Sequence, residues 1–286
     1  MIYISSACVK HKKIIDSITE LADSGFKNIE LSGGTEYYED YLSDIKSLKE
    51  KYDLNILLHN YFPPPKTPFV LNLASLRDDV FEHSFEHILK AIRISKELGA
   101  KKYAYHTGFL IDIKLSELGK PLTSDKLFER DKALERFIRA SDYALEEAGD
   151  ELQLYIENNV ISQANFKNFN SKDPFLFTTY SGFCDIRRKI NIKPLLDLAH
   201  LYVSSNTLGT NFEEESEKLL KMTDYVHISD NDGLSDANSA ISEGSEIHTY
   251  LERNSQIKEK TITLEIYEDL TKIKNSYKLI EQIDHA

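Results

Sequence analysis

The sequence predicts an α/β protein that folds as one (β/α)8 barrel over residues 1–286. Short apolar segments with strand-like alternation recur eight times, and helical or loop segments separate them along the whole chain. Strict alternation of strands and helices is typical of a parallel sheet. Eight such units in this length favour a closed barrel over an open sheet. No linker, low-complexity tract or clear internal repeat indicates a domain boundary.

The composition fits a folded protein of this size. Hydrophobic residues make up 41% of the chain and aromatic residues 10%, which is enough apolar surface for a substantial core. The net charge of −12 disfavours nucleic acid or an anionic membrane as the main partner. Cys8 and Cys184 show no paired spacing, which favours a reducing compartment. We therefore expect a cytoplasmic protein without a signal peptide or membrane span.

The eight expected strands share a short apolar core, and histidines or carboxylates lie at or just past the ends of the third to the eighth. The fifth is the clearest, because Leu152, Leu154 and Ile156 alternate with polar residues before the strand ends at Glu157. The expected strands lie in residues 2–7, 28–31, 54–58, 102–105, 152–160, 193–198, 225–228 and 261–266.

The expected helices carry apolar residues at helical spacing. In the first of them Ile14, Ile18 and Leu21 share one face, and Gly25 ends it. The expected helices lie in residues 11–24, 41–51, 77–98, 126–148, the later half of 166–190, 212–222 and 270–283. Four prolines make residues 61–74 a shaped loop, and residues 110–125 form an insertion.

Histidines and carboxylates gather at the ends of the later strands. Each alone would be a loop residue or a cap, but a barrel brings the strand ends to one mouth. Buried carboxylates there would repel one another by several kcal/mol without a cation, so this set predicts a divalent-metal site. Glu30, which ends the second strand, is close enough to approach it. The six residues are His59, His106, Glu157, Asp197, His227 and Glu265.

Four short motifs carry a resemblance to a known family. They are IENN at 156–159, DLAH at 197–200, HISDNDG at 227–233 and LEIY at 264–267. In this order and at strand ends, they resemble the xylose isomerase-like TIM-barrel superfamily, which includes sugar isomerases, ketose 3-epimerases, inosose dehydratases and endonuclease IV. The similarity runs from the first strand to the last. It is specific for the superfamily and much less so for the reaction.

The resemblance implies a divalent metal ion, Mn²⁺, Mg²⁺, Co²⁺ or Zn²⁺, held by four residues. These metal ligands are Glu157, Asp197, His227 and Glu265. In the ketose 3-epimerases, Glu157 and Glu265 match the residues that remove and return a proton next to a carbonyl, through a metal-stabilised enediolate. Asn60 and Asn158 are expected to bind the substrate. The expected function is isomerisation or epimerisation of a sugar or sugar phosphate in carbohydrate metabolism, and a dehydratase would begin with the same step.

The alternative is an endonuclease IV-like zinc phosphodiesterase that acts on abasic-site DNA. His59 and His106 match additional metal-binding histidines of that family, and otherwise they would bind substrate or a second metal. A third zinc would use His200 and Asp236, but Asn238 stands where a histidine is expected. This departure favours the sugar reaction. A barrel that keeps the site only for binding is a third possibility, and the sequence leaves open whether the chain forms a homo-oligomer.

Overall fold

The protein forms a closed barrel of eight parallel strands, so the expected fold class is confirmed. The structure is a computed structural model that describes residues 1–123 and 126–283. Each strand pairs with the next one in the chain, and β8 pairs with β1, where Tyr3 lies opposite Thr263. The strands are β1 (Ile2–Ser5), β2 (Asn28–Leu31), β3 (Asn55–His59), β4 (Lys102–His106), β5 (Gln153–Glu157), β6 (Lys193–Asp197), β7 (Tyr225–Ile228) and β8 (Thr261–Leu264).

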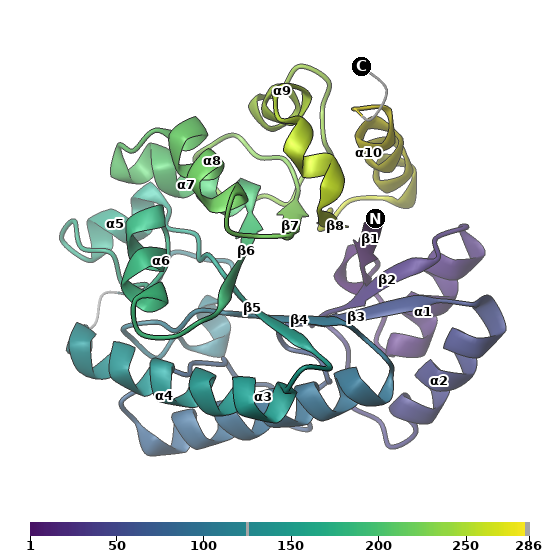
Figure 1. Cartoon of the computed structure of the whole chain (residues 1–286), viewed down its shortest axis with the longest axis horizontal. Coiled ribbons are helices and arrows are strands. Elements are labelled where there is room, and N and C mark those ends of the chain that lie inside the picture. The colour runs from purple at the N-terminus through teal and green to yellow at the C-terminus, as the bar shows by residue number, and fades with distance from the viewer. Residues whose placement is uncertain (124–125, 284–286) are drawn as a thin grey trace.

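Helices surround the strands (Figure 1). Several of them begin with a side-chain N-cap, such as the Asn211 side chain that accepts the backbone N–H of Glu214 in α8. Within the described ranges every helix is too short or too polar to cross a lipid bilayer. The α-helices are α1 (Ile14–Asp23), α2 (Tyr41–Tyr52), α3 (Asp78–Glu97), α4 (Arg130–Ala148), α5 (Gln163–Asn168), α6 (Tyr180–Arg187), α7 (Leu198–Leu208), α8 (Phe212–Leu220), α9 (Glu246–Arg253) and α10 (Leu270–Ile283).

Three helices were not expected, and two begin later than expected, since α1 begins at Ile14 rather than at residue 11. Helices α5, α7 and α9 lie in segments where the sequence predicted no helix, and α5 and α9 are short, with 6 and 8 residues. Helix α4 begins at Arg130 rather than at residue 126. The last two residues of the expected insertion, 124 and 125, and the last three of the expected domain, 284–286, lie outside the described ranges. The rest of the insertion contains only a short 3-10 turn, Leu115–Glu117.

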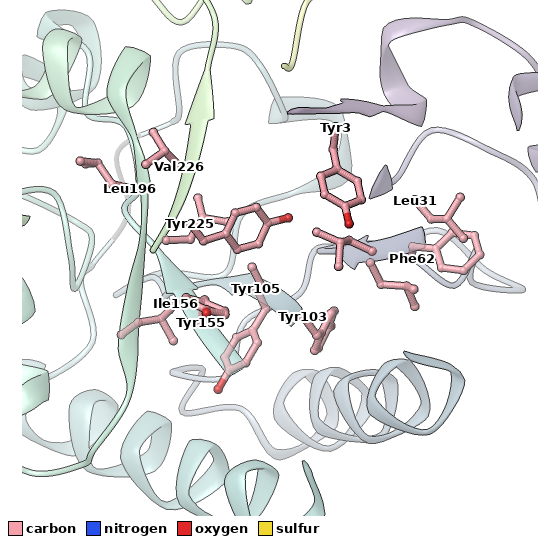
Figure 2. Packing of buried hydrophobic residues seen from close by; sticks show 14 of the residues in the cluster. Tyr3, Leu31, Phe62, Tyr103, Tyr105, Tyr155, Ile156, Leu196, Tyr225 and Val226 are labelled. Carbon is pink, nitrogen blue, oxygen red and sulfur yellow. The ribbon is translucent and has the colours of Figure 1, made fainter. Parts of the chain in front are cut away.

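Alternating side chains divide the core into a barrel interior and a layer between strands and helices. Figure 2 shows Tyr3 and Tyr225 pointing into the barrel, whereas Tyr105 points away from it. The Tyr105 ring lies 6.5 Å from the ring of Phe137 in α4, measured between centroids. Because inward and outward positions alternate along a strand, every second strand residue faces the interior that leads to the mouth.

Candidate metal centre

The C-terminal strand ends bring together all six histidines and carboxylates expected at the mouth. His59, His106, Glu157 and Asp197 are the last residues of β3, β4, β5 and β6. His227 is the third residue of β7, and Glu265 directly follows β8. The register places His106 beside Glu157 and Asp197 beside His227. All six lie where parallel barrels place their active sites.

One group of four residues has the composition of a site for a divalent cation. The potential ligand atoms of this group all lie within 4.8 Å of one another. Nδ1 of His227 is 3.5 Å from Oε1 of Glu157 and 3.6 Å from Oε2 of Glu265. Carboxylate oxygens with one imidazole suit Mg²⁺, Mn²⁺, Co²⁺ or Zn²⁺. The group is Glu157, Asp197, His227 and Glu265, and each of its members is buried.

Three polar atoms of this group have no hydrogen-bond partner among the described residues. Oε1 of Glu157, Oδ2 of Asp197 and Nδ1 of His227 are buried and make no hydrogen bond of standard geometry with a described residue. Buried polar atoms are normally satisfied, and an ion-binding role is a recognised reason for exceptions. A cation bound between these atoms would satisfy them and would balance the clustered carboxylates. The residues therefore fit a divalent metal ion.

Asp197 is oriented by the helix that follows it. Helix α7 begins at the very next residue, and the side chain of Asp197 is its N-cap. Oδ1 accepts the backbone N–H of His200 at 2.7 Å, and Oδ2 takes no part in this cap. His200 thus lies in the first turn of a helix rather than in a loop. One carboxylate can cap the helix with one oxygen and offer the other to a cation.

A second group surrounds the other oxygen of Glu157. Oε2 of Glu157 is 2.7 Å from Nε2 of His59 and 3.1 Å from Nδ1 of His106. These three residues could also hold an ion, because their ligand atoms lie within 4.8 Å of one another. Glu157 therefore presents Oε1 to one group and Oε2 to the other. This is the arrangement that a bridging carboxylate requires.

Neighbouring charges shift the pKa values of the side chains in this group. Burial opposes the ionisation of Glu157, but the neighbouring His106, His59 and His227 outweigh it and hold its pKa well below the ordinary value. Burial also opposes a charge on His227, but Glu30 and Glu265 raise the pKa of this imidazole well above the ordinary value. The His227 imidazolium thus supplies the positive charge that a cation would supply. Because a metal ligand must be deprotonated, cation binding would displace its Nδ1 proton.

Next to this centre His200, Asp236 and Asn238 form a polar cluster. Nδ1 of His200 donates to the backbone oxygen of Asn158 at 2.9 Å, and Nε2 lies 3.3 Å from Oδ2 of Asp236. The Asn238 amide donates to the same Asp236 oxygen at 3.3 Å. The amide of Asn238 therefore stands where a further metal-binding side chain would be needed beside His200 and Asp236. This cluster is not among the groups of described side chains that could hold a metal ion, and the third such group consists of Glu30, His59, His227 and Glu265.

The two asparagines that were expected to bind substrate differ in their surroundings. The Asn158 amide donates to the backbone oxygen of Asp197 at 3.0 Å and accepts the N–H of the same residue at 2.8 Å. The Asn158 side chain thus orients Asp197, and its predicted contact with substrate stays a prediction. The Asn60 amide interacts with the Tyr61 hydroxyl. Neither amide atom of this buried side chain makes a hydrogen bond of standard geometry with a described residue.

Glu30 contacts the centre more directly than the sequence indicated. It is fully buried in β2, and its Oε1 lies 3.1 Å from Nε2 of His227. The alternation of residues along β2 indicates this position, because Ile29 and Leu31 pack outward and leave Glu30 on the inward face. The hydroxyl of Thr263 donates to Oε2 of Glu30 at 2.9 Å. This threonine was not expected at the site, and nothing in its local sequence distinguishes it.

Comparisons with known proteins place the chain in a family. The family model described as "xylose isomerase-like TIM barrel" matches residues 18–283. Among solved structures, a D-tagatose 3-epimerase-like protein is 21% identical, with a TM-score of 0.72 over 99% of this chain and 96% of its own. D-psicose 3-epimerase from Clostridium cellulolyticum is 10% identical, with a TM-score of 0.68 over 100% and 99%.

Endonuclease IV from Thermus thermophilus has the same fold. It is 13% identical, with a TM-score of 0.63 over 99% of this chain and 98% of its own. At these identities the likeness shows the fold alone. No curated protein sequence matches the chain.

Proposed function

The chain belongs to the xylose isomerase-like TIM-barrel family, and we propose that it is a divalent-metal-dependent sugar isomerase or epimerase. The substrate would be a small carbohydrate or its phosphate, and the reaction would belong to cytoplasmic carbohydrate metabolism. One observation carries the proposal. The carboxylates of Glu157 and Glu265 both lie within 3.6 Å of the same nitrogen of His227, at the barrel mouth. The metal would be held by these three residues and Asp197.

The two carboxylates suit proton transfer at a carbon next to a carbonyl. Burial opposes the ionisation of Glu265, but the neighbouring His227 outweighs this effect and lowers the pKa of Glu265 to about 2. Glu157 is also held ionised, so both side chains are unprotonated at neutral pH, which is the state a general base must start from. A divalent cation, when bound, supplies Lewis-acid stabilisation of the negative charge that develops on the substrate oxygens. Proton removal by one carboxylate and return by the other would change the configuration of that carbon.

Other polar residues of the mouth support a substrate with several hydroxyl groups. Asn60 has a buried amide that lacks well-formed hydrogen bonds within the described part of the chain, and a sugar hydroxyl could supply them. His59 and His106 would bind further hydroxyls or hold a second ion with Glu157.

The second candidate function is an endonuclease IV-like zinc phosphodiesterase. The group formed by His59, His106 and Glu157 favours it, since a multinuclear centre needs a second ion next to the first. Asn238 weighs against it, because a trinuclear centre would need a better zinc ligand beside Asp236 and His200. The net charge of −12 also disfavours a polyanionic substrate.

Hydrogen exchange with solvent tests the proposed reaction. The protein is loaded with Mn²⁺ and incubated in D2O with a panel of ketoses, aldoses and their phosphates, and the sugars are analysed by ¹H NMR. We expect loss of one carbon-bound proton signal in at least one sugar, together with a new epimer or isomer. Cleavage of abasic-site DNA by the zinc-loaded protein, without exchange in any sugar, would overturn the proposal.

A further inference from the structure

Glu30 is a buried carboxylate that none of the proposed chemistry uses. It lies on the inward face of β2 and is 0% exposed, as is His227. Nε2 of His227 lies 3.1 Å from Oε1 and 3.3 Å from Oε2 of Glu30. The imidazole of His227 therefore lies between two sets of carboxylates. Glu30 faces Nε2, whereas Glu157 and Glu265 face Nδ1.

The hydrogen bonds around Glu30 define where the protons lie. An ionised carboxylate only accepts, so Nε2 of His227 must carry the proton of this contact. The Thr263 hydroxyl donates to Oε2 of Glu30 at 2.9 Å. The Tyr225 hydroxyl lies 3.5 Å from the Thr263 oxygen and can donate to it in turn. These contacts fix the carboxylate of Glu30 from the barrel interior, below the mouth.

We propose that Glu30 is a positioning residue for His227 as a metal ligand. By accepting the Nε2 proton it selects the tautomer in which Nδ1 keeps its lone pair once the cation is bound. It also fixes the plane of the ring and makes Nδ1 a stronger electron-pair donor to the metal ion. This inference rests on the proposed metal centre and not on the identity of the sugar.

The expected effect is on metal affinity. Loss of a carboxylate that accepts from a metal-ligating histidine typically weakens metal binding by about 10- to 100-fold. Glu30→Gln keeps the size of the side chain and removes its charge. We expect its dissociation constant for Mn²⁺ to rise by about that factor. A merely structural role would lower the melting temperature of the metal-free protein and leave the dissociation constant unchanged.

The test is isothermal titration of the metal-free full chain with MnCl2, with melting temperatures measured in parallel. Asp224→Asn is the matched control, because it removes a hydrogen-bonded carboxylate at the opposite end of the barrel and should leave Mn²⁺ affinity unchanged. Glu30→Asp retains the charge but moves the carboxylate away from His227, so its dissociation constant should rise by more than twofold but by less than that of Glu30→Gln. It replaces Glu30→Gln in the titration should the latter fail to fold.

The outcomes separate the two proposals. A dissociation constant for Glu30→Gln, or for Glu30→Asp in its place, within twofold of the parent value would overturn the role of Glu30 alone. A parent protein that binds no Mn²⁺ would overturn the metal centre, and the role of Glu30 with it. A selective rise in the Glu30 variants, absent from Asp224→Asn, would support both.

Discussion

At the scale of single residues, Glu157 is the centre of the site. Its two oxygens face different groups, with His227 3.5 Å from Oε1 and His59 2.7 Å from Oε2. The sequence predicted a carboxylate at this strand end and predicted its histidine neighbours. It could not predict which oxygen meets which histidine, because those contacts depend on side-chain rotamers. Nor could it predict that the Asn158 amide orients Asp197, since that contact joins two different strand ends.

Replacing Glu265 tests the proposed proton transfer. Glu265→Gln keeps the shape of the side chain but removes the proton-accepting carboxylate. Because acid–base catalysis contributes about 10²- to 10⁴-fold, we expect solvent-deuterium incorporation to fall at least about 100-fold. The exchange rate is measured by ¹H NMR at saturating Mn²⁺, so that weaker metal binding does not limit it. Glu252→Gln, at an exposed carboxylate of α9, is the control and should exchange at the parent rate. Unchanged exchange in Glu265→Gln would exclude Glu265 as an acid or base.

At the scale of secondary structure elements, the junction of β6 and α7 links folding to the site. Strand and helix meet without a loop, and Asp197 belongs to both as last strand residue and N-cap. The helix was not predicted, because Leu198, Ala199, Leu201 and Val203 are all buried and the segment shows no polar face. The strands were easier to predict, since each has a short apolar core with a polar residue at its end or directly after it.

Two substitutions of Asp197 separate its two roles. Asparagine caps helices about as well as aspartate, whereas alanine does not and costs about 1 kcal/mol. We therefore expect Asp197→Asn to keep most of the stability of the metal-free protein but to bind Mn²⁺ more weakly. Asp197→Ala should lose both stability and affinity. Urea unfolding and calorimetric titration measure the two properties. Equal destabilisation by the two substitutions would contradict the capping role.

At the scale of the whole molecule, the barrel has one end built for stability and one for chemistry. Opposite the mouth, Asp224 precedes β7 and accepts from Lys102 at 2.9 Å and from Lys193 at 3.0 Å. The Tyr155 hydroxyl also donates to it. The sequence predicted the barrel because all eight strand patterns lay in order. It did not indicate this cluster, whose members are distant in the chain and unremarkable in their local patterns.

The Asp224 cluster predicts a pH dependence of stability. Partial burial opposes the ionisation of Asp224, but hydrogen bonds from Tyr155, Lys102 and Lys193 outweigh it and lower its pKa. A carboxyl whose folded pKa is lowered stabilises the fold above its unfolded pKa of about 4, and this contribution is lost as the pH falls toward the folded value. Because Asp224 is partly exposed and screened by solvent, we expect Asp224→Asn to cost only about 1 kcal/mol at pH 7.

Urea unfolding of the parent and of Asp224→Asn at pH 7 and pH 3 measures this contribution. The difference in the free energy of unfolding should shrink at the lower pH, because the carboxyl of the unfolded parent chain then binds a proton that the folded protein does not. A difference that is constant or larger at pH 3 would contradict the role assigned to the cluster.

The positions of bound cations test the central claim most directly. Crystals of the protein grown with MnCl2 would be measured at the manganese absorption edge, and crystals grown with ZnCl2 at the zinc edge. The proposed function predicts one main anomalous peak, bounded by Glu157, Asp197, His227 and Glu265. Three zinc peaks, with the third beside His200, Asp236 and Asn238, would contradict it, as would the absence of any peak within the group of four.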